Sequence, residues 1–194
     1  MIKNLREKII LATIELGAKK GIESISIKDI GDKCKVSSAA MYYHFKNKYE
    51  LLFEAAFFVV KEITDCICKN AEPSAECEKQ YKETMKVIAD YHIANPTKSI
   101  FYTRMLVVPS MELSKGDLSK IRDYCPLTQN LRLWQQQDKI CDMPQIMSVA
   151  YYPLCIYLLH NFINKIKPTE QSVNSIIDHL WYMISKKQAV TVNS

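Results

Sequence analysis

The stretch of sequence that decides the fold is Ser26–Phe45, which reads SIKDIGDKCKVSSAAMYYHF. Its apolar residues recur at the three- and four-residue steps of helices on both sides of a turn at Lys35. Serines stand where helices need N-caps, since Ser24 or Ser26 can cap the first helix and Ser37 can cap the second. Two short helices joined by a tight turn are typical of a helix-turn-helix.

The second of these helices, which we expect to end near Asn47, combines small residues with two adjacent tyrosines, Tyr42 and Tyr43. A helix that enters the major groove of DNA needs small side chains for close approach and polar tips for phosphates and base edges. Two neighbouring exposed tyrosines also favour a surface that a partner covers, because each leaves a large ring in water. The pattern therefore predicts a DNA-reading helix.

The segment from Ser26 to Leu52 resembles the signature of the TetR family of transcriptional regulators. The resemblance rests on Ile-x-x-Ile, Val-Ser, Met-Tyr-x-His-Phe and Lys-Asn-Lys-x-x-Leu-Leu, in that order along the chain. It implies an all-α fold, double-stranded operator DNA as a partner, and contacts with that DNA at matching positions. These positions are Lys28, Ser37, Ser38, Ala39, Ala40, Tyr42, Tyr43, His44 and Lys48.

Three of these positions have a second interpretation. Tyr42 could brace the core of a small three-helix domain, His44 could satisfy a local hydrogen bond, and Lys48 could be a solvated lysine. Two residues depart from the family pattern. Lys35 stands where the family usually has Gly, and a left-handed backbone there costs about 1–2 kcal/mol, so the turn either changes shape or tolerates strain. Gly31 replaces the usual Ala, which we expect to cost roughly 1 kcal/mol.

The remaining chain is expected to be helical, with no stretch that alternates like a strand. Ile2, Leu5, Ile9, Ala12 and Leu16 form the apolar stripe of a first helix, which Gly17 and Gly21 would end. We predict a DNA-binding domain at residues 1–47 and a ligand-binding and dimerisation domain at residues 48–194. The expected later helices cover about residues 48–69, 75–94, 97–108, 117–138, 144–165 and 169–187.

Charge and composition narrow the function. Residues 1–50 hold ten Lys and Arg against six Asp and Glu, or +4 of the net +5, which favours contact with a polyanion or else a solvated basic face. The few glycines form no phosphate-binding motif.

The cysteines and histidines exclude further classes of protein. The seven cysteines are odd in number and form no CxxC pair, which predicts a reduced cytoplasmic protein. The four histidines lack metal spacing and no nucleophile motif occurs, so we expect neither an enzyme, a metal nor a cofactor.

Residues 143–164 contain no charged side chain and approach the length of a membrane span. Their polar residues are costly in lipid, so we expect no membrane partner and favour a helix buried by its own core and a partner subunit. The resemblance implies a homodimer joined by the last two helices. The expected interface residues are Ile156, Tyr157, His160, Ile177, Leu180, Trp181 and Ile184, with an intrachain core as the alternative.

The resemblance also implies a small-molecule effector of unknown identity, bound in the helical body, that releases a repressor from its operator. The candidate effector residues are Phe58, His92, Tyr102, Met105, Trp134 and Tyr152, although each could be ordinary core. Arg104 would either hold an anionic group or extend into solvent. The alternative is a redox-responsive regulator that uses Cys66 and Cys68, which point in different directions on one helix.

Overall fold

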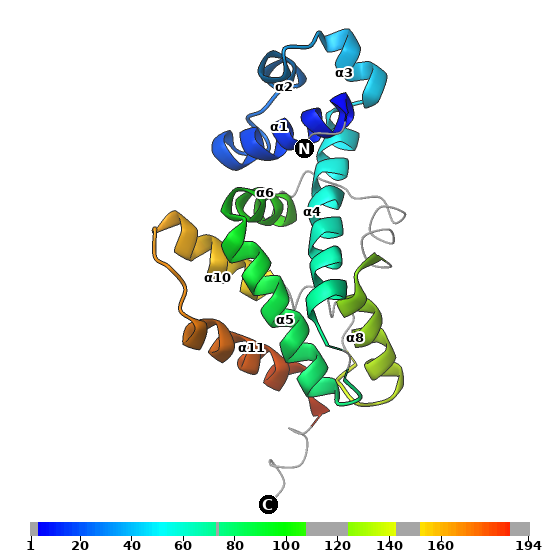
Figure 1. Ribbon diagram of the computed structural model, residues 1–194, viewed down its shortest axis with the longest axis vertical. Coiled ribbons are helices and arrows are strands. Elements are labelled where there is room, and N and C mark those ends of the chain that lie inside the picture. The colour runs from blue at the N-terminus through cyan, green and yellow to red at the C-terminus, as the bar shows by residue number, and fades with distance from the viewer. Residues whose placement is uncertain (1–3, 73, 108–123, 143–151, 187–194) are drawn as a thin grey trace, which may run out of the picture. The chain divides into compact units, whose positions relative to one another are not determined.

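The computed structural model describes residues 4–72, 74–107, 124–142 and 152–186, and its regular structure there is helical (Figure 1). Within these ranges the only β-type pairing is an isolated antiparallel bridge between Ile140 and Ser185. The predicted all-α class is confirmed. The helices are α1 (Leu5–Lys20), α2 (Ile27–Cys34), α3 (Ser38–His44), α4 (Lys48–Asn70), α5 (Cys77–Ala94), α6 (Pro96–Val107), α8 (Pro126–Gln136), α10 (Tyr152–Ile163) and α11 (Glu170–Ile184).

The chain packs as two compact units. We call Met1–Glu62 with Asn95–Ile121 the head unit, and Ile63–Ala94 with Arg122–Ser194 the body unit. Helix α4 contributes residues to both units, and α6 belongs to the head unit. The domain boundary predicted at residue 47 lies within the head unit, and it stays a prediction.

In the head unit α1 packs against both α2 and α6, so it buries a wider face than the predicted stripe. Ile10 and Ile14 are buried although they lie outside that stripe, whereas Leu16 is only half-buried. Gly17 does not end the helix as predicted. A Cβ atom at Gly17 would lie 2.7 Å from Cδ2 of Phe101, so the missing side chain is what lets α6 approach. The helix ends at Gly21, whose φ is 94°.

Arg104 of α6 caps the C-terminal end of α1. Its Nη1 donates hydrogen bonds to the carbonyl oxygens of Gly17 at 3.0 Å and Ala18 at 2.8 Å. The last carbonyls of a helix lack partners within the helix and carry its partial negative charge, so a guanidinium is well suited to this position. Arg104 therefore fulfils neither prediction made for it, because it joins two helices of the head unit.

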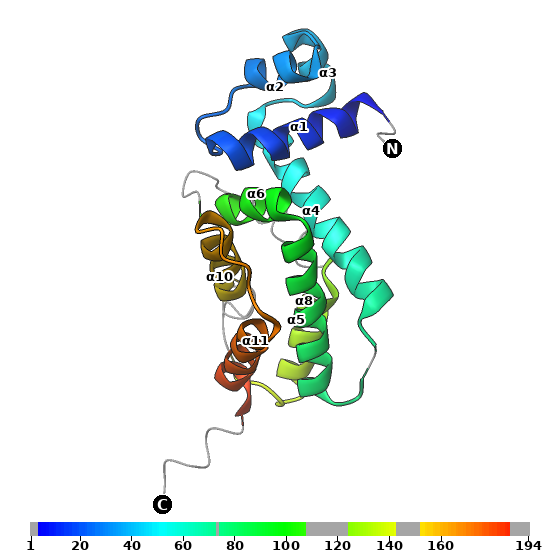
Figure 2. The same ribbon diagram turned by 60° about the vertical axis from the view of Figure 1, so that its left-hand side comes forward.

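The body unit is organised around Trp181 of α11. Its ring lies 5.3 Å from that of Tyr81 on α5 and 6.3 Å from that of Trp134 on α8, measured between centroids. Helices α5 and α11 run side by side in both ribbon views (Figures 1 and 2). This packing makes the aromatic face of α11 part of the core of a single chain.

The uncharged stretch at residues 143–164 is described only from Tyr152 onward, where α10 begins. Leu154, Cys155 and Leu158 of α10 are fully buried. Among the described residues, none of the helices combines the length and the hydropathy that crossing a lipid bilayer requires.

Candidate nucleic-acid interface

Helix α2 begins at a capping box, and the structure selects Ser26 rather than Ser24 as the N-cap. The Asp29 backbone N–H donates to Ser26 Oγ at 3.1 Å, and the Ser26 backbone N–H donates to Asp29 Oδ2 at 2.9 Å. Lys20 forms an ion pair with Asp29 at 3.0 Å. Hydrogen bonds from the Ser26 hydroxyl and from Lys20 hold the pKa of Asp29 well below its usual range. The start of α2 is therefore fixed by side chains of the head unit.

The turn between α2 and α3 is left-handed at Lys35, where glycine was expected. Lys35 has φ 59° and ψ 44°, its backbone N–H donates to Asp32 at 3.2 Å, and the Val36 N–H donates to Gly31 at 2.9 Å. These two bonds make the helix-ending Schellman turn, which places its left-handed residue at position 35. Of the two predicted outcomes, the strain is tolerated.

Gly31 has a role that the sequence alone did not suggest. A Cβ atom there would lie 3.0 Å from the carbonyl oxygen of Val36, the residue that follows the left-handed turn. The expectation of a simple loosening is therefore incomplete, because an alanine would press on the backbone of the turn. The two departures from the family pattern, Gly31 and Lys35, meet in one turn.

Helix α3 has the predicted N-cap but a different end. Ser37 Oγ accepts the backbone N–H of Ala40 at 3.2 Å. The helix stops at His44 because Phe45 is extended, with φ −141°. Asn47, predicted near the end of α3, instead begins the next helix, where its Oδ1 accepts the Glu50 backbone N–H at 2.8 Å.

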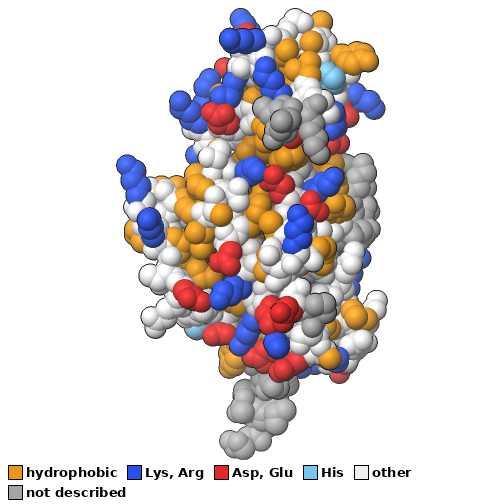
Figure 3. All heavy atoms as spheres, in the orientation of Figure 1, with side chains coloured by type: hydrophobic (Ala, Val, Ile, Leu, Met, Phe, Trp, Pro, Cys, Tyr) orange, Lys and Arg blue, Asp and Glu red, His pale blue; other side chains and the backbone are white. Residues whose placement is uncertain are grey.

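The outer face of α3 is set by its one buried residue, Met41. At about 100° per residue, Ala39 and Tyr43 lie roughly 160° to 200° away from Met41 around the helix. Tyr43 is 86% exposed and Tyr42 is 55% exposed, so the alternative that Tyr42 belongs to the core is wrong. Hydrophobic side chains gather over α3 on the face shown in Figure 3.

Two further predicted contacts lie at the edge of this face. His44 is half-buried, with its ring centroid 5.2 Å from that of Tyr43 and 6.4 Å from that of Phe45. Lys48 Nζ donates to the backbone carbonyl of Glu23 at 3.2 Å. An ammonium group has three donors, so this bond leaves Lys48 able to contact a phosphate.

The basic residues of the head unit divide into paired and unpaired ones. Lys33 pairs with Glu15 at 2.8 Å, and Arg6 pairs with Glu54 at 3.1 Å. Three exposed lysines flank α3 in sequence and have side chains with no acidic partner among the described residues: Lys28, Lys35 and Lys46. Positive charge is therefore available on the segments that adjoin the predicted DNA-reading helix.

The predicted effector residues are divided between the two units. Phe58, Tyr102 and Met105 belong to the head unit, whereas His92 and Trp134 belong to the body unit. The side chain of Tyr152 lies outside the described residues.

His92 is the most deeply buried titratable residue of this set. Its Nε2 lies 3.8 Å from Cys155 Sγ, and burial lowers its pKa to about 4. It is therefore a neutral core residue at pH 7.

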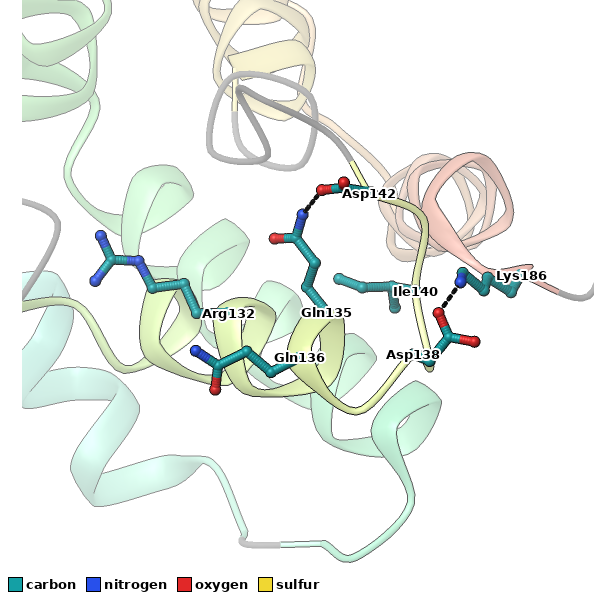
Figure 4. Close-up of a pocket in the computed structure, with 7 residues that line it drawn as sticks. All are labelled: Arg132, Gln135, Gln136, Asp138, Ile140, Asp142 and Lys186. Atoms are coloured by element: carbon teal, nitrogen blue, oxygen red, sulfur yellow. Dashed lines mark hydrogen bonds and ion pairs between the residues drawn. The ribbon is translucent and has the colours of Figure 1, made fainter.

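Two hollows in the body unit are lined by other residues. One, of about 460 Å³, lies beside α8 (Figure 4). Its two acids are paired, Asp142 with Gln135 and Asp138 with Lys186, and the guanidinium of Arg132 points away from both. The second, of about 290 Å³, is lined by Lys82, Glu83, Lys86, Asn174, Ile177 and Asp178. Neither hollow includes a predicted effector residue.

The predicted dimer residues on α11 need correction. Ile177, Leu180, Trp181 and Ile184 are buried within the chain, because α11 packs against α5 and its tryptophan against α8 as well. The side chain of Ile156 lies outside the described residues, Tyr157 is half-buried and His160 is exposed.

The interface residues predicted on α11 did not include Tyr182 and Met183. These two side chains are 64% and 48% exposed. Their exposure could have been predicted from their position directly after the buried stripe. Neighbouring residues in a helix point about 100° apart, so they turn away from the buried face.

Cys66 and Cys68 lie in the last turns of α4, and the helix is continuous through both. All seven cysteines carry free thiols. Burial raises the pKa of Cys34 and, with a small contribution from nearby Cys68, that of Cys125. A raised pKa lowers the thiolate fraction and hence the reactivity of a thiol.

Comparison with known proteins agrees with this geometry. Residues 9–55 match the family model for bacterial regulatory proteins of the tetR family. An uncharacterised HTH-type transcriptional regulator of Haemophilus influenzae is 30% identical over 94 residues, which are 48% of this chain and 50% of that protein. The Staphylococcus epidermidis biofilm operon icaADBC negative transcriptional regulator IcaR is 26% identical over 86 residues, or 44% of this chain and 46% of IcaR. The chain thus spans about half the length of these curated relatives.

The fold match covers nearly the whole chain. A TetR family transcription regulator from Marinobacter aquaeolei VT8 has a TM-score of 0.77 at 13% identity, over 93% of this chain and 95% of that one. The match of residues 9–55 covers α2, the strained turn and α3, the elements that present the two exposed tyrosines. The N-terminal end of the chain therefore matches the helix-turn-helix domain of the tetR family of bacterial regulatory proteins, and the chain has the fold of solved TetR family regulators.

Proposed function

We propose that the chain is a ligand-responsive transcriptional repressor that binds a palindromic operator as a homodimer. The observation that carries the DNA-binding role is the outer face of α3, where Tyr43 is 86% exposed on a helix that buries only Met41. A large ring held in water on a short, well-capped helix has no use in the chain's own core. It suits a surface that a DNA groove covers.

Each part of the head unit has a task in this proposal. The small side chains at the start of α3 let the helix approach the base edges. Tyr42, Tyr43 and His44 contact the backbone or a base edge beside them. Lys28 and Lys48 contact phosphates, which position the helix and carry no sequence information.

The repressor role is proposed from the relative in Staphylococcus epidermidis, whose name describes a negative transcriptional regulator. The effector role rests on the family resemblance and on the size of the helical body. Its candidate residues remain Phe58, His92, Tyr102, Met105, Trp134 and Tyr152. An effector would release DNA only to the extent that it binds the DNA-free conformation more tightly than the DNA-bound one.

The dimer proposal needs a partner surface other than the predicted stripe of α11. The exposed residues Tyr182 and Met183 of α11 and His160 of α10 supply one. Two subunits related by a two-fold axis would read half-sites about one helical turn apart, or a multiple of it. Sedimentation equilibrium of wild type and of Tyr182→Glu tests the surface, since a charge there should shift the protein toward monomer. Unchanged association in this variant would remove α11 from the proposed interface.

DNA binding is tested by selection from a library of random duplexes with the purified chain. We expect enrichment of a palindromic sequence that the protein binds with a discrete gel shift and a steep loss of affinity with salt. A scrambled duplex of equal length and composition is the control. Failure to enrich any sequence, or equal binding to the scrambled duplex, would refute the specific-regulator proposal.

The redox-responsive alternative makes a different prediction. Cys68 is exposed on α4, while the raised pKa of Cys125 disfavours it as a reactive thiol. If the alternative holds, an oxidant abolishes binding to the selected duplex, a thiol restores it, and Cys68→Ser removes this response. Binding that is insensitive to oxidant would exclude it.

A further inference from the structure

We infer that α3 recognises thymine through its 5-methyl group, so that the bound half-site presents thymines to Ala39. This inference rests on the proposed DNA binding and names the chemistry of that same site. It concerns which base edges the helix reads, which neither the family match nor the fold decides.

The residues of α3 exclude the common polar readout. Bidentate recognition of guanine needs Arg or Lys, that of adenine needs Asn or Gln, and acceptance from cytosine needs Asp or Glu. Helix α3 reads SAAMYYH and contains none of these. The hydroxyl of Ser38 pairs with any base, and Oγ of the N-cap residue Ser37 already accepts the Ala40 N–H. The small side chains of α3 that approach the bases closely, the alanine methyls, therefore read a base by apolar contact.

The geometry selects Ala39 from the two alanines. Ala39 is exposed and lies on the side of α3 opposite buried Met41, one turn before Tyr43, whereas Ala40 is half-buried. A helix that inserts this side into the major groove presents the Ala39 methyl to the base edges. Thymine is the one base with a methyl group there, and apolar contact with alanine is its usual readout.

The charged residues cannot replace this readout. The three lysines whose side chains have no acidic partner among the described residues are Lys28 on α2, Lys35 in the turn and Lys46 after α3. None of them lies on α3, and the phosphate contacts that lysines beside the helix can make bind all sequences alike. Discrimination between bases is left to the outer side of α3.

The test replaces single thymines of the duplex selected by the protein with deoxyuridine, which lacks only the 5-methyl group. We expect one position in each half-site where the replacement weakens binding roughly fourfold, the equivalent of one buried methyl-sized group. Thymines outside the half-sites are the control and should show no change. Equal affinity for every deoxyuridine duplex, with specific binding of the parent duplex intact, would overturn the inference and leave the proposed function standing.

A variant then assigns the contact. Ala39→Gly should bind the thymine and deoxyuridine duplexes equally well, because the protein methyl is gone. Ala94→Gly makes the same change at an exposed alanine at the end of α5 and should keep the fourfold difference. A difference that survives in Ala39→Gly would overturn the assignment to Ala39. Since the deoxyuridine series uses the wild-type chain, the readout is testable even if the variant folds poorly.

Discussion

Helices α3 and α11 each carry two adjacent aromatic residues, and the structure uses the pairs differently. On α3 both Tyr42 and Tyr43 are exposed, whereas on α11 Trp181 is 9% exposed and Tyr182 is 64% exposed. The longer helix packs on α5 and directs its tryptophan into the core of the body unit. The shorter helix buries only Met41 and leaves both rings outside.

The difference shows that an aromatic stripe on a helix does not by itself mark a partner surface. The caps of helix α3 and the turn at Lys35 fix its position, so its outer face need not pack against another helix. Helix α11 depends on its aromatic face for its own attachment to the body unit. The face that remains for a partner is the neighbouring one, around Tyr182.

The largest expected effect concerns α11, the helix whose aromatic residue is packed in the core. Trp181→Ala should lower the free energy of unfolding by about 3–5 kcal/mol, because it removes a ring that contacts Tyr81 and Trp134. Tyr182→Ala, at the next and exposed position, should change it by less than about 0.5 kcal/mol. Urea unfolding of both variants makes the measurement. Similar losses in the two would show that the assigned faces of α11 are incorrect.

The second prediction concerns buried His92 in the body unit. Its pKa is lowered to about 4 from an ordinary value of 6.5. Between these two pH values the imidazole is protonated in the unfolded chain but stays neutral in the folded chain. The free energy of unfolding should therefore fall by about 3 kcal/mol between pH 6.5 and pH 4 on account of this group.

His92→Gln cannot take up this proton, so it provides the comparison. The variant's deficit in stability relative to wild type should shrink as the pH falls, which urea midpoints at pH 7.5 and pH 4.5 would detect. A constant deficit at both pH values would contradict the assignment to His92.

The third prediction concerns α3, the helix whose tyrosines are exposed. Tyr43→Ala should weaken binding to the selected duplex by roughly 1–3 kcal/mol. The free energy of unfolding should change by less than about 0.5 kcal/mol, since the ring packs little within the chain. Leu133→Ala is the control, because it removes an exposed apolar side chain of α8 that belongs to neither α3 nor the proposed dimer surface. A titration by fluorescence anisotropy decides the point, and unchanged affinity would remove Tyr43 from the contact surface.

The smallest expected effect concerns the turn that orients α3. Lys35→Gly relieves a left-handed strain of about 1–2 kcal/mol but adds about 0.4–1 kcal/mol of freedom to the unfolded chain. The net gain in the free energy of unfolding should lie between zero and about 1.6 kcal/mol. Lys35→Ala keeps the strain and should show no gain. If the ammonium contacts DNA, both variants lower the salt dependence of binding by about one ion.

Local signals in the sequence predicted much of the head unit. The caps at Ser26 and Ser37 and the buried stripe of α4 depend on residues close in sequence, so their spacing was enough. The cap that Arg104 supplies to α1 and the close approach at Gly17 join residues more than eighty positions apart. No local pattern contains such contacts.

By itself, the sequence determined the all-α class and the position of the helix-turn-helix. These follow from helical periodicity and capping, which act over a few residues. Only the tertiary structure decided that Tyr42 is outside the core, that Trp181 is inside it and that α6 belongs to the head unit. The physical reason is that a stripe shows which face of a helix is apolar, whereas burial depends on which other helix covers that face.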